Sequence, residues 1–252
     1  MIKIEQIPDP FFTALQKVKS LENFDEYIGA FVFGSLARGE QTKDSDVDMK
    51  VLTSRDYACD KVNHPYVNNI KLDISFNSIE QLREDTVNEM NGNRIPFICE
   101  SIIIFDKENL LRELQKEASV AKPSSLKKKN VAWTKFMFYH INDKAKRNLK
   151  NDPASSLLAM GINLNEVLKY HYKLNNKWWV SNKRLLGDLR AWDPELARLL
   201  EKYLLETDLL RKYGGWVEIL DYVAAPLGEW RDLEETNCSC KHCKKDLERL
   251  LR

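Results

Sequence analysis

A short stretch, residues 33–48, brings together residue types that can do phosphate chemistry. Gly34 and Ser35 form a turn directly after an apolar run, and Asp46 and Asp48 lie two positions apart ahead of another apolar run. In a strand, side chains at this spacing point to the same face, so we expect the two carboxylates side by side. Such carboxylates repel each other unless a cation lies between them, and hard oxygen ligands suit Mg²⁺. The pattern therefore predicts phosphoryl or nucleotidyl transfer.

A third carboxylate, Asp73, comes from a later segment in which apolar and polar residues alternate. In residues 69–76 the apolar side chains fall on one face, which puts Asp73 on the other. We expect Asp73, on a neighbouring strand, to complete a second metal site beside the first. Two metals about 3.5–4 Å apart stabilise both the attacking and the leaving oxygen of an in-line displacement. Gly34 lets the backbone approach a phosphate, and Ser35 with the N–H groups of a helix N-terminus is expected to bind triphosphate oxygens.

These motifs resemble the pattern of the DNA polymerase beta-like nucleotidyltransferase superfamily. The segments that match it position by position are Phe33-Gly34-Ser35, Asp46-Val47-Asp48-Met49 and Leu72-Asp73-Ile74. Ala37-Arg38-Gly39 with Ser45-Asp46 is similar to the small stand-alone bacterial members. The resemblance implies transfer of a nucleoside monophosphate from a nucleoside triphosphate, expected to be ATP, to an acceptor hydroxyl. It also implies release of pyrophosphate and two Mg²⁺ ions held by the three aspartates.

Three further residues are expected at the nucleotide. Arg38 either contacts the triphosphate, which suits its charged fork, or pairs with Glu40 or Asp44 on the surface. Ser45 either orients the loop of the first aspartate or is a plain turn hydroxyl. Lys169 is a candidate to reach the triphosphate from the second half of the chain, although a solvated lysine is the default interpretation.

Glu100 is the candidate general base. It interrupts an apolar strand predicted over residues 98–105. In antibiotic nucleotidyltransferases a carboxylate outside the metal trio acts on the acceptor hydroxyl, and such a base works best when its pKa lies near the operating pH. The alternatives are a solvated glutamate at a sheet edge, and Asp73 taking the proton instead.

The pattern of elements changes at a break around residues 121–125. Before it, strands alternate with helices; after it, periodicity is almost purely helical. The predicted strands are 27–33, 47–52, 69–76 and 98–105, and the predicted helices are 10–24, 35–39, one from 79, 109–117, 131–150, 153–174, 195–205 and 208–222, the last interrupted at Gly214-Gly215. The expected fold is α+β. It consists of a nucleotidyltransferase α/β domain (1–122), a mixed sheet with flanking helices, and a C-terminal all-α helical-bundle domain (126–252). The second domain looks like that of the aminoglycoside and other antibiotic nucleotidyltransferases, in architecture alone.

Composition limits the partners. The 252 residues are 43% hydrophobic and 31% charged, with a net charge of +1. Because proteins that grip long nucleic acids usually carry a basic excess, such a partner is disfavoured. No apolar stretch approaches the ~20 residues that span a bilayer, and the N-terminus lacks the apolar core of a signal peptide. A cytoplasmic protein is expected.

Two features outside these motifs are expected to be structural. The tail residues Cys238, Cys240, His242 and Cys243 are the right types for zinc, but they lack a second, separated ligand pair. Exposed thiols are the preferred interpretation, and metal binding by this tail is left open. His171, on the helix predicted over 153–174, is expected to serve packing.

The sequence favours one function and leaves two rivals. The favoured acceptor is a small hydroxylated molecule bound between the domains, such as an antibiotic, which would imply a role in antibiotic resistance. The first rival is nucleotidylation of a partner protein or of a nucleic-acid end. The second is a non-catalytic nucleotide-binding module, which a complete aspartate trio argues against.

Overall fold

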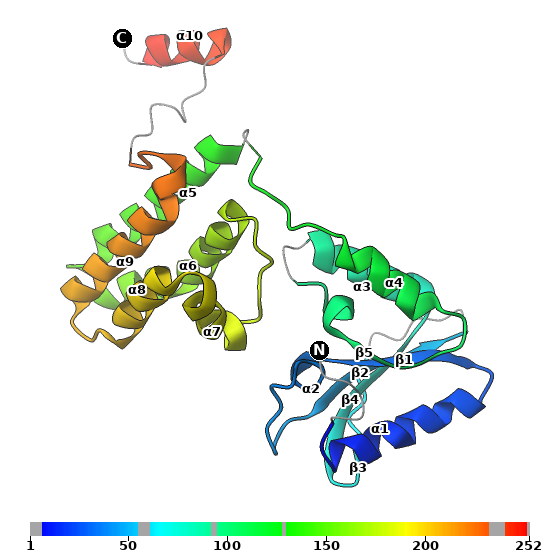
Figure 1. Ribbon diagram of the computed structural model, residues 1–252. Helices are drawn as coiled ribbons and strands as arrows, with labels where there is room; N and C mark the ends of the chain where they lie inside the picture. The colour runs from blue at the N-terminus through cyan, green and yellow to red at the C-terminus, as the bar shows by residue number, and fades with distance from the viewer. Residues whose placement is uncertain (1–6, 55–60, 92–94, 128–129, 232–239, 251–252) are drawn as a thin grey trace. The chain divides into compact units, whose positions relative to one another are not determined.

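The chain consists of two compact units, Met1–Ser124 and Ser125–Arg252 (Figure 1). The structure is a computed structural model that describes residues 7–54, 61–91, 95–127, 130–231 and 240–250. No helix within these residues is long and apolar enough to cross a lipid bilayer.

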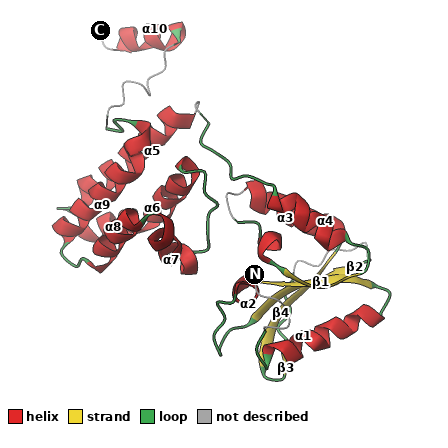
Figure 2. Cartoon of the chain, viewed as in Figure 1, coloured by secondary structure: helices red, strands yellow, loops and turns green. Residues whose placement is uncertain are grey.

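The N-terminal unit is built on a mixed sheet, as predicted; in the described residues it has five strands, one more than expected (Figure 2). Its strands are β1 (Tyr27–Phe33), β2 (Val47–Thr53), β3 (Tyr66–Val67), β4 (Ile70–Asn77) and β5 (Ile102–Asp106). They lie in the order β3-β4-β2-β1-β5. Neighbouring strands are antiparallel except β2 and β4, which run parallel.

Helices cover both faces of this sheet, and the strand alternation decides which residues face which helix (Figure 1). Helix α1 (Phe11–Lys19), followed by the 3₁₀ helix η2 (Ser20–Asn23), packs on one face. Helices α3 (Ile79–Asn91) and α4 (Leu110–Ser119) pack on the other. The residues of β2 and β4 that join the core with α1 are Val47, Met49, Val51, Ile70, Leu72 and Ile74. Because successive strand residues alternate, the polar residues between them point to the opposite face.

A tight hairpin joins β3 to β4. Asn68 and Asn69 form its two-residue turn, with φ values of 50° and 66°. Turns with positive φ at both central residues match the twist of antiparallel strands, and asparagine tolerates this conformation. The turn fixes the register, pairing Val67 with Ile70 and Tyr66 with Lys71.

The prediction of a strand over residues 98–105 is wrong for the first half of this segment. Residues Phe97–Glu100 form the 3₁₀ helix η3, and β5 begins only at Ile102. Side chains take the carbonyl groups here: the Gln115 amide donates to the carbonyls of Ile98 and Ser101, and the Ser101 hydroxyl also donates to that of Ile98. The apolar pattern was correct about burial but not about backbone shape, because Ile98 is buried in the core between the sheet and helices α3 and α4 without itself lying in a strand.

The C-terminal unit is entirely helical in its described residues. Its helices are α5 (Val131–Asn148), α6 (Pro153–Leu174), α7 (Asn182–Trp192), α8 (Pro194–Leu205), α9 (Leu209–Ala224), η5 (Ala225–Leu227) and α10 (Lys241–Leu250). Aspartates cap three of them, since the side chains of Asp152, Asp193 and Asp208 accept backbone N–H groups of α6, α8 and α9.

The predicted interruption at Gly214-Gly215 is wrong, because α9 runs through both glycines. A Cβ built on Gly215 would lie 3.6 Å from the Cβ of Tyr203 on α8. This is an ordinary van der Waals distance, and a Cβ on Gly214 would meet nothing within 4 Å, so the available space requires glycine at neither position. Packing between two helices outweighs the low helix propensity of glycine.

Candidate active site

The parallel pairing of β2 with β4 brings the three aspartates together. Asp48 and Asp73 are register partners on these strands, and Asp46 lies in the loop one residue before β2. One carboxylate oxygen from each residue lies within 4.8 Å of the others, and all three side chains are half-buried. The sequence suggested that strand alternation places Asp46 beside Asp48. Because Asp46 lies outside the strand, the course of the loop before β2 also contributes to placing it there.

Gly34 lies so close to Asp48 that no side chain fits at its position. It is the first residue of the short helix α2 (Gly34–Arg38), which follows β1 directly, and β1 pairs its last residue, Phe33, with Asp48. Gly34 has φ +74°, and a Cβ on it would collide with Asp48 Oδ2. Both the backbone conformation and the space therefore require glycine. Ser35 is the next residue of the same helix.

Two donors contact the third aspartate. Lys71 Nζ lies 2.8 Å from Asp73 Oδ1 and 3.7 Å from Asp46 Oδ2. His64 Nδ1 lies 2.6 Å from Asp73 Oδ1. Burial alone would raise the pKa of Asp73, but the hydrogen bonds from Lys71 and His64 outweigh it and lower that pKa below its ordinary value. The bond to Asp73 raises the pKa of Lys71. Asp73 is therefore ionised at neutral pH.

His64 and Lys71 did not emerge as site residues from the sequence. The signal that identifies His64 is the Asn68-Asn69 pair, because a two-residue turn at this point fixes which residues face each other. Counting back from that turn puts residue 64 opposite residue 73. Lys71 needed only the alternation of β4, which places it on the same face as Asp73.

Arg38 and Glu100 form an ion pair with each other. Arg38 Nε lies 2.9 Å from Glu40 Oε2, and its Nη1 lies 3.3 Å from Glu100 Oε2. The predicted surface pairing with Glu40 is present. Glu100 is at the end of η3 rather than in a strand, and its ion pair ties it to α2, the helix that begins at Gly34.

Ser45 forms part of a turn before the first aspartate. Its hydroxyl accepts the Thr42 N–H at 2.9 Å, and its own N–H bonds the Thr42 carbonyl at 3.1 Å. These bonds close a turn in the loop that leads to Asp46, which is compatible with both interpretations from sequence.

Lys169 belongs to the C-terminal unit. It lies on α6 with Nζ 2.6 Å from Glu166 Oε1, in an exposed pair. Its role at a triphosphate stays a prediction. Of the tail residues, Cys240 is exposed and Cys243 is half-buried, whereas Cys238 lies outside the described residues.

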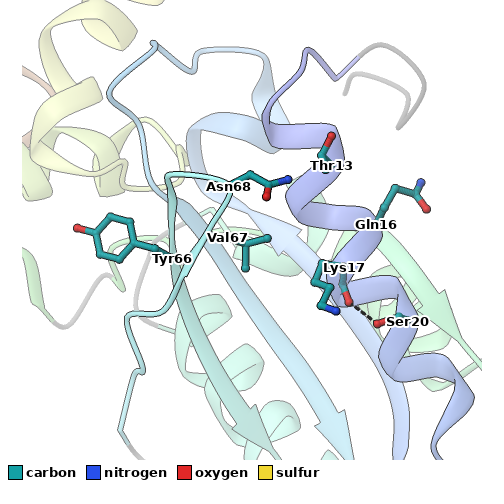
Figure 3. Close-up of a pocket in the computed structure, with 7 residues that line it drawn as sticks. All are labelled: Thr13, Gln16, Lys17, Ser20, Tyr66, Val67 and Asn68. Atoms are coloured by element: carbon teal, nitrogen blue, oxygen red, sulfur yellow. Dashed lines mark hydrogen bonds between the residues drawn. The ribbon is translucent and has the colours of Figure 1, made fainter.

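A shallow hollow of about 600 Å³ lies elsewhere on the N-terminal unit, between α1 and the β3–β4 hairpin (Figure 3). Its lining residues are Thr13, Gln16, Lys17, Ser20, Tyr66, Val67 and Asn68. Figure 3 shows Val67 and Asn68 turned toward α1 and the ring of Tyr66 turned away from it. None of the three aspartates lines this hollow.

The aspartate cluster fits a divalent cation by its donor set. Three carboxylates supply hard oxygen atoms within reach of one another, which is the ligand type that Mg²⁺ prefers. The ammonium of Lys71, shared between Asp46 and Asp73, shows that the cluster attracts positive charge.

No curated protein matches the chain. Among solved structures, a nucleotidyltransferase-like protein from Exiguobacterium sibiricum 255-15 shares 15% sequence identity at a TM-score of 0.48, over 85% of this chain and 74% of that one. Residues 16–121 match the family model described as polymerase beta, nucleotidyltransferase. The matched segment contains Gly34 and all three aspartates. The N-terminal unit therefore contains a segment, residues 16–121, that is similar to the polymerase beta nucleotidyltransferase family.

Proposed function

We propose that this protein moves a nucleoside monophosphate from a nucleoside triphosphate to a hydroxyl of a small molecule, with Mg²⁺ as the metal. ATP is the proposed donor. The observation that carries the proposal is the convergence of Asp46, Asp48 and Asp73 beside Gly34. Three carboxylates held this close repel one another unless a cation lies among them.

In the proposed reaction the acceptor oxygen forms a bond to the α-phosphorus, and the bond to the pyrophosphate oxygen breaks. Pyrophosphate leaves with that electron pair, and the hydroxyl proton passes to a carboxylate. When bound, two divalent cations would neutralise the triphosphate and stabilise the attacking and leaving oxygens. The three aspartates would hold the cations. The bare backbone of Gly34 leaves space beside Asp48 that a side chain would fill.

The proposed base is Glu100, with Asp73 as the alternative. Glu100 is half-buried and paired with Arg38, so taking a proton there weakens an ion pair. Asp73 is bound by two donors and sits among the proposed metal ligands, where positive charge opposes protonation. A Glu100→Gln substitution separates the two, because it removes the proposed base and leaves the three aspartates in place.

A small acceptor is favoured over a polymer by charge. The chain carries 39 basic and 38 acidic residues, so it lacks the overall basic excess that attracts a polyanion. An antibiotic is one candidate class of small hydroxylated acceptor. A protein acceptor is compatible with the same chemistry and is an outcome of the experiment below.

The test is to follow the label from α-phosphate-labelled nucleoside triphosphates with antibiotics, metabolites and cell lysate as acceptors. We expect Mg²⁺-dependent label transfer to a small molecule with release of pyrophosphate. In Asp48→Asn the rate should fall by about 10²–10³-fold or more, because a group that supports transition-state charge is lost. The matched control is Asp25→Asn, an exposed aspartate of the same unit.

Two results would contradict the proposal. An unchanged rate in Asp48→Asn would mean that the aspartate cluster takes no part in the reaction. Label found on a protein instead of a small molecule would keep nucleotidyl transfer and overturn the acceptor class.

A further inference from the structure

His64 stands directly opposite Asp73 at the edge of the sheet, although it lies just outside β3. Asn63 and Ile74 exchange both backbone hydrogen bonds, at 2.8 and 3.0 Å. One step further along, the Leu72 N–H donates to the Pro65 carbonyl at 2.9 Å. His64 and Asp73 therefore form the pair between two hydrogen-bonded positions, where antiparallel backbones approach most closely and side chains meet.

Three side chains consequently form a row across the sheet. Asp48 on β2 is the register partner of Asp73 on β4, and Asp73 in turn faces His64. The row lies on the face opposite α1. Figure 3 shows Tyr66 turned away from α1, and His64, two residues earlier along the same extended segment, shares that face.

The hydrogen bond between His64 and Asp73 has a defined direction. Asp73 is ionised, and an ionised carboxylate can only accept, so Nδ1 of His64 carries the hydrogen over the 2.6 Å contact. Lys71 contacts the same oxygen, Oδ1. Both donors therefore bind Oδ1, and together they hold the carboxylate in one orientation.

The two donors respond differently to a cation at the aspartate cluster. The Lys71 ammonium already lies between Asp46 and Asp73, so a divalent cation at the cluster would repel it. The imidazole of His64 can donate while neutral and need not leave. His64 is thus the donor that can keep Asp73 oriented once the cluster holds a metal.

We propose that His64 is a positioning residue: its Nδ1–H holds Asp73 in the orientation in which the carboxylate joins Asp46 and Asp48 around a divalent cation. The inference rests on the proposed function and extends it to a residue outside the motifs. His64 acts through Asp73 rather than as a ligand, because the metal-sized cluster found in the described part of the chain comprises the three aspartates alone. Hydrogen bonds to ligating carboxylates tune metal sites, and losing one costs about 10–100-fold in metal affinity.

The experiment measures Mn²⁺ affinity by electron paramagnetic resonance on the full chain, with and without a non-hydrolysable ATP analogue. His64→Ala removes the donor, whereas His64→Asn puts an amide N–H close to the position of Nδ1. The control is His140→Ala, an exposed histidine on α5 that stacks on Phe136. Thermal melting without metal checks that each variant is folded.

We expect His64→Ala to weaken Mn²⁺ binding by about 10-fold or more, with melting unchanged. His64→Asn should recover most of the affinity, and His140→Ala should bind as the unaltered protein does. Unchanged affinity in His64→Ala would overturn the inference and leave the proposed function standing. Equal weakening in His64→Asn and His64→Ala would also overturn it, because the donor would then not be the cause.

The proposed function fails by a different result. In that case the unaltered protein would bind Mn²⁺ no more tightly than Asp48→Asn, with or without the ATP analogue. The proposed role of His64 would then be overturned as well, because it depends on metal binding by the three aspartates.

Discussion

The two units each contain a histidine–aspartate pair of almost the same length, and the pairs differ in nearly everything else. His64 Nδ1 lies 2.6 Å from Asp73 Oδ1 in the N-terminal unit, and His171 Nε2 lies 2.7 Å from Asp193 Oδ2 in the C-terminal unit. The side chains of the first pair are 56% and 21% exposed, and those of the second are 6% and 10% exposed. The same contact thus occurs in two environments.

The buried pair is saturated. Asp193 Oδ2 takes the His171 bond, and its Oδ1 accepts both the Leu196 N–H at 3.1 Å and the Tyr222 hydroxyl at 2.8 Å. The imidazole also stacks on Trp192, with ring centroids 5.2 Å apart. Asp193 therefore caps α8 and ties it to α6 and α9. Every donor and acceptor is used inside the fold, which is the mark of a structural pair.

The N-terminal pair is unsaturated and surrounded by like charge. Both donors to Asp73 contact one oxygen, and the neighbouring carboxylates of Asp46 and Asp48 repel it. The comparison teaches that a histidine–aspartate contact does not by itself indicate function. What distinguishes the two pairs is whether the surrounding fold uses up the binding capacity of the carboxylate.

The largest expected effect is in the buried pair. Asp193→Ala should lower the free energy of unfolding by about 3–5 kcal/mol, because it removes a helix cap and leaves a buried histidine and a half-buried tyrosine without their acceptor. Urea unfolding measures the change. The control is Asp208→Ala, an exposed cap of α9, which should cost about 1 kcal/mol. Equal losses in the two variants would mean that the buried network adds nothing to the cap.

An intermediate effect is expected from pH. Burial lowers the pKa of His171 below its ordinary 6.5, despite the opposing bond to Asp193. Below about pH 6.5 the unfolded chain then binds a proton that the folded chain does not, so stability falls as pH falls, by at most about 1.4 kcal/mol per pH unit.

Unfolding free energies measured between pH 7 and 5 test this sign. The slope should become shallower in His171→Leu, because this variant removes the buried group whose pKa is lowered in the folded chain. Asp193 does not contribute in this range, because its hydrogen bonds hold its pKa below the ordinary value despite burial. A slope unaffected by His171→Leu would contradict the assignment of this pH dependence to His171.

The smallest effect on stability is expected in the N-terminal pair. Asp73→Asn should change the metal-free unfolding free energy by less than about 1 kcal/mol, because ion pairs with exposed partners contribute little. The same substitution should abolish the rise in melting temperature that Mg²⁺ produces in the unaltered protein. A large loss of metal-free stability would place this pair in the same class as the buried one.

Local signals predicted most of the fold. The bounds of β1 and α6 agree with the sequence prediction, because an apolar run ending at a Gly-Ser turn and an Asp-Pro cap act on neighbouring residues. Predictions failed where distant residues decide the backbone. Gln115 holds the carbonyls of η3 in place of a strand partner, and α9 packs against α8 and continues through Gly214 and Gly215. Helix α7 was not predicted.

The sequence by itself determined which acids are present, their order, and the strands that carry Asp48 and Asp73, because strand alternation and turn residues act over a few positions. Only the tertiary structure decided what those acids touch. The bond from His64 to Asp73, the ion pair between Arg38 and Glu100, and the saturation of Asp193 by Tyr222 all join separate elements. Such contacts depend on strand register and on packing. The apolar faces of two segments are buried in the core, and this burial holds their polar side chains at hydrogen-bond distance.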